Sequence, residues 1–296
     1  MRHLLCLLTV AALLGCSSEE RLIVGSKNFS ENVFLAELVA QHVEATTDIP
    51  VERRLNLGGT FICHQALLVG EIDLYPEYTG TALTSILEAP IVKDRAGALA
   101  SVREQYEQRF DATWAAPFGF EDTYAILVRD ADAPDDLRTI SDLARYTDAY
   151  TIGFNFEFIE REDGWRGFQR TYDLAFEKEP VTMDLSLVYQ GLAERRIDVA
   201  VGNSTHGLIP KLGLRQLDDD RRYFPPYDAA AIVRQDAFAR FPGLEAALAE
   251  LDGKIDGDAM REINRRLDVE LEPVEAVARD FRERVFGASS NGNGSR

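Results

Sequence analysis

The sequence predicts an α/β fold of two lobes, in which the second lobe is inserted into the first. Short apolar stretches alternate with amphipathic ones along residues 21–286, a pattern typical of strands that alternate with helices in largely parallel sheets. The chain passes between the two halves at two points, and neither point has a Pro- or Ser-rich linker. We therefore expect two connecting strands that act as a hinge between the lobes.

The first lobe is expected to open with strands that each lead into a helix. Apolar stretches predict strands at residues 22–24, 51–57 and 72–75. Amphipathic segments predict helices at residues 30–46, 60–70, 79–87 and 93–110. Ser30 is expected to cap the first of these helices, because its hydroxyl can accept a hydrogen bond from a free backbone N–H.

The rest of the body is expected to enter a second lobe and to return. Strands are predicted at residues 124–128, 150–153, 199–202 and 229–233. Helices are predicted at residues 185–196, 243–251, 257–267 and 273–285. The first strand of this series leads into the second lobe, and the last one leads back to the first lobe after a Pro-Pro break.

The composition excludes several classes of protein. With 32 Lys and Arg against 50 Asp and Glu, the formal net charge is −18, whereas a nucleic-acid binder needs a basic face. A hydrophobic share of 46% is enough for a sizeable core and excludes a disordered chain. The single long apolar run lies at the start, which excludes a protein with several membrane spans.

The first residues have the character of a secretion signal. A basic Met1-Arg2-His3 precedes an apolar run that is too short to span a bilayer, and the run ends in Leu13-Leu14-Gly15-Cys16. This ending resembles the lipobox of bacterial lipoproteins, in which the chain is cleaved before a cysteine that carries diacylglycerol. The resemblance implies a signal peptide at residues 1–15, a lipidated Cys16 and a polar tether at residues 16–20. The alternative is a buried helix with an incidental cysteine.

The mature chain would then keep one free thiol and an unstructured tail. Cys6 leaves with the signal and Cys16 is lipidated, so Cys63 remains alone and no internal disulfide is possible. We expect Cys63 to be a small core residue. Residues 287–296 have low complexity and are expected to be a disordered tail.

Five short motifs occur in a fixed order along the body: Lys27-Asn28-Phe29-Ser30-Glu31, Glu77-Tyr78-Thr79-Gly80-Thr81, Asp122-Thr123-Tyr124, Arg161-Glu162-Asp163-Gly164 and Phe224-Pro225-Pro226-Tyr227. Together they resemble the substrate-binding proteins of osmoprotectant ABC importers, which take up glycine betaine, choline, carnitine and similar solutes. The resemblance covers nearly all of residues 21–286. It implies a type II periplasmic-binding-protein clamp with two hinge-crossing strands. On this chain, lobe 1 would be residues 21–121 and 227–286, and lobe 2 residues 122–226.

The motifs place three tyrosines where such proteins bind their ligand. A trimethylammonium group is cationic but has no N–H to donate, so aromatic faces suit it better than hydrogen-bond acceptors. The matching rings are Tyr78, Tyr124 and Tyr227. They come from different lobes and from either side of the hinge, so closure would assemble them into a cage.

The resemblance also implies partners for the polar end of the ligand. Relatives that bind betaines hold the ligand carboxylate with basic and hydroxyl groups, and the matching positions are Lys27, Thr81 and Arg161. Thr60, in a Gly-Gly-Thr turn, is expected to line the cleft. Asp122 is expected to place a negative charge or a backbone carbonyl near the ammonium.

The chain departs from the family pattern after the predicted strand at 199–202. Asn203-Ser204-Thr205-His206-Gly207 stands where the family often has a tyrosine followed by Ser-Thr-Asp-Gly. The fourth aromatic wall and the usual aspartate are therefore missing. Tyr189 either compensates for the missing ring or packs its helix against the sheet. The open wall leaves room for a larger or more polar betaine, such as carnitine or ergothioneine, whose extra groups would meet Asn203 or His206.

These features predict a monomeric, lipid-anchored receptor on the periplasmic or cell-surface side of a bacterial membrane. It would close on a quaternary ammonium ligand and deliver it to an ABC permease, without a cofactor and without chemistry on the ligand. No histidine has metal-ligand spacing to a second one, and Ser204 lacks a nucleophile elbow. Three alternatives remain: the same fold with another polar solute such as an amino acid, a secreted enzyme on this fold, and an adhesion or scaffolding lipoprotein.

Overall fold

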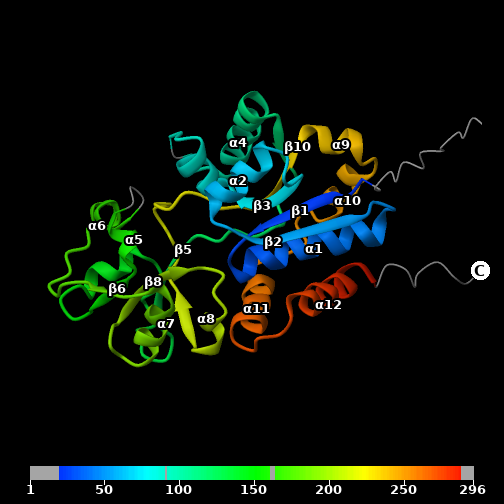
Figure 1. The fold of residues 1–296 in the computed structure, drawn as a ribbon. Helices are drawn as coiled ribbons and strands as arrows, with labels where there is room; N and C mark the ends of the chain where they lie inside the picture. The colour runs from blue at the N-terminus through cyan, green and yellow to red at the C-terminus, as the bar shows by residue number, and fades with distance from the viewer. Residues whose placement is uncertain (1–19, 91, 161–163, 288–296) are drawn as a thin grey trace, which may run out of the picture.

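The computed structural model describes residues 20–90, 92–160 and 164–287, and within them it has two five-stranded sheets with helices against each (Figure 1). The predicted α/β class is confirmed. The first sheet has the order β2 (Val51–Gly58), β1 (Leu22–Lys27), β3 (Leu74–Tyr78), β10 (Ala229–Arg234) and β4 (Ala112–Trp114). The second has the order β7 (Val181–Thr182), β6 (Ile152–Phe154), β8 (Val199–Asn203), β5 (Tyr124–Arg129) and β9 (Leu214–Gln216).

Helices from both ends of the chain cover the first sheet. They are α1 (Ser30–Thr46), α2 (Thr60–Leu68), α3 (Thr79–Thr81), a π-helical turn (Ala82–Ile86), α4 (Arg95–Phe110), α9 (Gln235–Arg240), α10 (Leu244–Glu250), α11 (Gly257–Asp268) and α12 (Val274–Phe286). The second sheet carries a 3₁₀ turn (Ser141–Arg145), α5 (Phe156–Glu160), α6 (Trp165–Tyr172), α7 (Leu185–Ala193) and α8 (Leu208–Lys211). In Figure 1 the second sheet and its helices form the green part of the molecule.

Half of the strand pairings are antiparallel, which corrects the expectation of largely parallel sheets. β1 runs parallel to β2 and β3, and β6 runs parallel to β7 and β8. By contrast, β5 is antiparallel to β8 and β9, and β10 is antiparallel to β3 and β4. The antiparallel strands β5 and β10 are the two that follow the crossings between the sheets, so each enters its sheet from the opposite end.

The two crossing segments, residues 115–123 and 217–228, are bonded to each other between the sheets. Glu121 and Asp228 form an antiparallel bridge, and the backbone N–H of Asp122 donates to the carbonyl of Tyr227 at 3.2 Å. The predicted lobe boundaries fall at this point, and the division of the chain into lobes at these residues stays a prediction.

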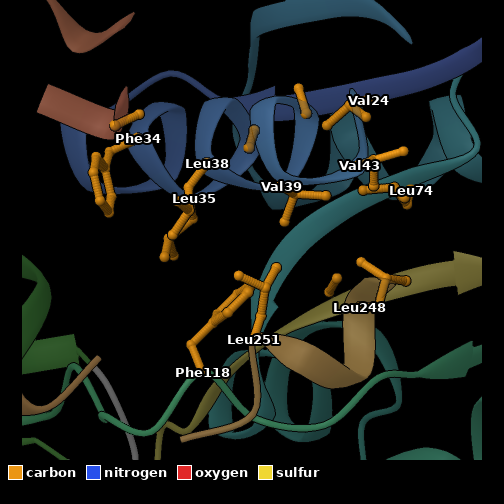
Figure 2. Close-up of a cluster of buried hydrophobic side chains, with 14 of the residues drawn as sticks. Val24, Phe34, Leu35, Leu38, Val39, Val43, Leu74, Phe118, Leu248 and Leu251 are labelled. Atoms are coloured by element: carbon orange, nitrogen blue, oxygen red, sulfur yellow. The ribbon is translucent and has the colours of Figure 1, made fainter. Parts of the chain in front are cut away.

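Helix α1 is the centre of the main hydrophobic core. Its middle has no exposed side chain, because the first sheet lies on one side and α10, α11 and α12 lie on the other. Figure 2 shows side chains of α1 facing Phe118 and Leu251, which belong to the first crossing and the end of α10. A second cluster packs α2 and α4 against the opposite face of the sheet and contains the fully buried Cys63, as expected of a small core residue.

Two local expectations are wrong. Ser30 does not cap α1: the cap position is Phe29, in extended conformation and without a side-chain cap bond. Instead, the Asn32 side chain accepts a hydrogen bond through Oδ1 from the backbone N–H of Lys27 at 2.7 Å. This bond stabilises the turn between β1 and α1. The third strand begins at Leu74 rather than residue 72 and continues to Tyr78, so it carries Tyr78 to the edge where the sheets face each other.

Candidate functional site

A cleft of about 450 Å³ lies between the two sheets. Side chains from both sheets and from both crossing segments line it: Lys27, Asn28, Phe29, Gly59, Thr60, Tyr78, Thr81, Asp122, Thr123, Tyr124, Asn155, Asn203 and Tyr227. The structure thus brings together most of the predicted site residues, namely Tyr78, Tyr124, Tyr227, Lys27, Thr81, Thr60, Asp122 and Asn203. Arg161 and Cys16 lie outside the described residues.

Strand register explains how the three tyrosines come to one cleft. Tyr78 ends β3 and pairs with Ala229 of β10, so Tyr227, two residues earlier, lies beside it. Gly80 makes room for this ring, because a Cβ at Gly80 would lie 2.7 Å from two ring carbons of Tyr227. Tyr124 begins β5 in the other sheet, opposite Asn203 of β8. The aromatic wall is therefore divided between the two halves of the molecule.

The ring of Tyr124 is supported from behind. Its centroid lies 5.1 Å from that of Phe158 and 5.3 Å from that of Phe224. Both phenylalanines belong to the core of the second sheet. The orientation of the Tyr124 ring is therefore set by packing before any ligand enters.

Phe29 is a fourth aromatic residue of the cleft, and sequence reasoning missed it. Its ring is 41% exposed and stacks on Tyr78, with centroids 6.2 Å apart and planes at 27°. The signal was present, since Phe29 lies in the Lys-Asn-Phe-Ser-Glu motif just before a helix. Of this motif, only Lys27 is expected from the sequence to contact the ligand. The family's usual fourth ring is absent at Asn203, and Phe29 supplies an aromatic surface at another point of the cleft.

Lys27 is not a free cation. Its Nζ forms a buried ion pair with Glu77 and lies 5.1 Å from the ring centroid of Tyr78. Glu77 is fully buried, and Lys27 is 4% exposed. The expected partner of a ligand carboxylate is therefore already neutralised, and no other Lys or Arg lines the cleft among the residues that the structure describes.

Two carboxyl groups lie at one side of the cleft: the partly buried Asp122 lines it, and the buried Glu31 lies in the adjoining cavity. Asp122 accepts hydrogen bonds from Asn203 Nδ2 at 3.0 Å and from Thr205 Oγ1 at 2.9 Å. Glu31 accepts one from the Tyr78 hydroxyl at 2.6 Å. Burial, reinforced by the charge of Asp122, raises the pKa of Glu31 to about 8, and burial also raises the pKa of Asp122.

Neither Tyr189 nor His206 lines the cleft, and Tyr189 follows the second of its two alternatives. The Tyr189 ring is buried and its hydroxyl accepts from the backbone N–H of Asn203 at 2.7 Å, so it packs α7 against β8 instead of replacing the missing wall. His206 stacks on Tyr189 with centroids 3.9 Å apart. It lines an adjoining cavity of about 510 Å³ that shares Asn28, Phe29, Asp122 and Asn203 with the cleft, and its contact with ligand stays a prediction.

A divided aromatic wall with the carboxylate of Asp122 at one side suits a cation that cannot donate hydrogen bonds. Residues 20–284 match the family described as the substrate-binding domain of ABC-type glycine betaine transport systems. The chain belongs to this family. The resemblance drawn from the five motifs is thereby confirmed.

Relatives and solved structures extend the match over nearly the whole chain. The chain is 36% identical over 271 residues to the carnitine transport binding protein OpuCC of Listeria monocytogenes serotype 1/2a (strain 10403S), which covers 90% of this chain and 88% of that protein. It is 32% identical over 269 residues to the ergothioneine transport permease/ergothioneine binding protein EgtU of Helicobacter pylori (strain G27), covering 90% of this chain and 48% of that longer protein. The crystal structure of a glycine betaine/carnitine/choline ABC transporter has a TM-score of 0.84 at 30% identity, covering 89% of this chain and 98% of that chain. The two-lobed clamp fold is confirmed.

Within residues 20–90, 92–160 and 164–287, no three His, Cys, Asp or Glu side chains are grouped so that they could hold a metal ion. No helix in these ranges combines the length and apolar character that a membrane span requires.

Proposed function

We propose that this chain captures a quaternary ammonium solute in the cleft between its two sheets and delivers it to an ABC permease. The observation that carries the proposal is that Tyr78, Tyr124 and Tyr227 line one cleft although they come from both sheets. Such rings attract a diffuse cation by about 0.5–2 kcal/mol each, most strongly where water is excluded. Family membership points to the same class of ligand.

The clamp gives binding a mechanical consequence. A ligand that touches rings on both halves stabilises the arrangement in which those halves are close, so it shifts the population toward the closed form. The permease would distinguish loaded from empty protein by this shape. The ligand leaves unchanged, and the proposal includes no cofactor and no enzymatic step.

The polar wall favours a second candidate within this class. Asn203 replaces the aromatic wall by an amide, which donates a hydrogen bond to the carboxylate of Asp122. A betaine with additional polar groups, such as carnitine or ergothioneine, would find partners there. The relatives named for carnitine and ergothioneine transport favour this reading over an amino acid without methyl groups on nitrogen.

We also propose that the protein works outside the cytoplasm as a lipid-anchored monomer. The support is the lipobox-like Leu13-Leu14-Gly15-Cys16 and the short polar tether after it. Two or three acyl chains on Cys16 would hold it stably at a membrane, at about 0.8 kcal/mol per buried methylene. Loss of labelled fatty acid from a Cys16→Ser variant in bacterial cells, with the wild type labelled, is the expected result.

Calorimetry with a matched ligand panel tests the function. Glycine betaine, choline, carnitine and ergothioneine are compared with glycine, which keeps the carboxylate of glycine betaine but replaces its methyl groups by N–H donors. We expect at least one quaternary compound to bind and glycine to bind at least tenfold more weakly. Binding of glycine or other unmethylated amino acids, with none of the quaternary compounds, would replace the proposal by the amino-acid reading.

A further inference from the structure

The two halves of the molecule are held together at a second place, away from the crossing strands. The loop at residues 204–207 follows β8 of the second sheet, and it rests on α11, which packs beside the first sheet (Figure 1). Arg261 of α11 donates from Nη1 to the carbonyl of Ser204 at 2.8 Å. Asn264 of the same helix donates from Nδ2 to the carbonyl of Thr205 at 2.8 Å. We call this contact between α11 and the loop the α11 joint.

Gly207 shows how close the two backbones are. A Cβ built on Gly207 would lie 2.4 Å from the backbone N of Arg265, 2.5 Å from its Cα and 2.8 Å from the backbone carbon of Asn264. Real Cβ atoms do not approach a helix backbone this closely, and a backbone cannot swing aside as a flexible side chain can. Any side chain at this position must therefore push the loop away from α11.

A chain of buried hydrogen bonds connects the α11 joint to the ligand cleft. Asn264 Nδ2 also donates to Glu31 Oε2 at 2.7 Å, and the Tyr78 hydroxyl donates to Glu31 Oε1 at 2.6 Å. On the other side of the joint, Thr205 donates to Asp122, which lines the cleft. Glu31, Asn264 and Thr205 are each at most 4% exposed, so water does not compete for these bonds.

We propose that the α11 joint, together with the crossing strands, sets the angle at which the two halves face each other across the cleft, and that Glu31 and Asn264 are positioning residues that couple it to the ligand-facing ring of Tyr78. Neither residue lines the cleft of about 450 Å³, and both line the adjoining cavity of about 510 Å³. They act by fixing how the second sheet, with Tyr124 and Asn203, is placed relative to Tyr78. The inference rests on the proposed function, because it assigns a role in ligand affinity to residues outside the lining of the ligand cleft.

The first experiment needs no ligand. Gly207→Ala is compared with Gly257→Ala, a matched control at the start of the same helix, where a Cβ would meet only the far end of Arg261 at 3.9 Å. Small-angle X-ray scattering of the two variants and the unmodified protein is expected to show a larger radius of gyration for Gly207→Ala alone. If Gly207→Ala folds and scatters like the other two proteins, the joint does not set the angle between the halves and the proposal is overturned.

The second experiment measures coupling to binding. Tyr78→Phe removes the hydroxyl that reaches Glu31 but keeps the ring, and Asn264→Leu removes the bonds to Glu31 and the loop at similar volume. With a quaternary ammonium compound that binds the unmodified protein, we expect each change to weaken Kd about threefold or more. We expect the double variant to lose less than the product of the two, because both break one chain. Lowered melting temperatures with unchanged Kd values would reduce the network to a structural role.

The two proposals fail in different ways. If the unmodified protein binds no quaternary ammonium compound, the proposed function is wrong, and the scattering comparison still decides whether the joint sets the angle between the halves. If it binds one but the Asn264→Leu variant binds equally well, the function stands and the coupling is overturned. Should Gly207→Ala fail to fold, scattering of Asn264→Leu replaces it, and the same larger radius of gyration is expected.

Discussion

Tyr124 offers the sharpest test of how the cleft recognises its ligand, because its ring can be changed without disturbing its support. Phe158 and Phe224 hold the ring from behind at centroid distances of 5.1 and 5.3 Å. Tyr124→Phe keeps the aromatic face in this place. Tyr124→Leu keeps an apolar side chain over the same two phenylalanines but removes the ring quadrupole.

The expected magnitude follows from the value of one ring against a cation. A loss of about 0.5–2 kcal/mol corresponds to a Kd that is about 2- to 30-fold weaker. The upper part of this range applies if closure excludes water from the cleft, since the interaction strengthens when the cation is desolvated. We therefore expect about tenfold weaker binding for Tyr124→Leu and less than threefold for Tyr124→Phe.

Isothermal titration calorimetry at constant pH and ionic strength measures both variants against the same quaternary ammonium ligand. Thermal unfolding without ligand serves as the control for folding. Equal affinity of Tyr124→Leu and the unmodified protein would refute the idea that this ring holds the cation. An equal loss in both variants would assign the effect to the hydroxyl instead of the ring.

Three further predictions concern single side chains. Phe29→Leu is expected to weaken ligand binding by about 2- to 10-fold in calorimetry, because it removes the exposed ring stacked on Tyr78; unchanged affinity would remove Phe29 from the site. Asn203→Tyr is expected to raise the affinity for choline or glycine betaine relative to carnitine and ergothioneine by restoring an aromatic wall, and an unchanged ligand profile would show that this position does not set specificity. Burial raises the pKa of Glu31 to about 8. Between about pH 5 and 8 the folded chain therefore keeps a proton that the unfolded chain releases. For this residue alone, the free energy of unfolding falls as the pH rises, by at most about 5 kcal/mol. Glu31→Gln cannot ionise and should flatten this part of the stability curve in urea unfolding, whereas a curve parallel to that of the unmodified protein would contradict the assignment.

The first half of the fold could be predicted because its elements are long and periodic. The β1, α1 and β2 segments lie within a few residues of their predicted bounds. The second half could not be predicted so well, since α5, α8, β7 and β9 are too short to show a period. The sequence also does not show whether a strand runs parallel or antiparallel to its neighbours. For β5 and β10 this depends on the end from which the crossing segment enters the sheet.

The same distinction applies to the site. Tyr78, Tyr124 and Tyr227 could be predicted because they lie inside recognisable motifs. The pairing of Lys27 with Glu77 joins residues 50 positions apart and depends on β1 and β3 being neighbours, so no local pattern reveals it. The burial of Tyr189 depends likewise on how α7 meets β8, which places its hydroxyl against the backbone of Asn203.

The most direct test of a cation held by aromatic faces is to remove the charge from the ligand and leave its shape. Calorimetry would compare choline, or whichever quaternary compound binds best, with its neutral carbon isostere, in which a tert-butyl group replaces trimethylammonium. We predict that the isostere binds at least tenfold more weakly to the unmodified protein. Equal affinity for the two compounds would mean that the rings provide only an apolar surface and do not attract the charge of the ligand.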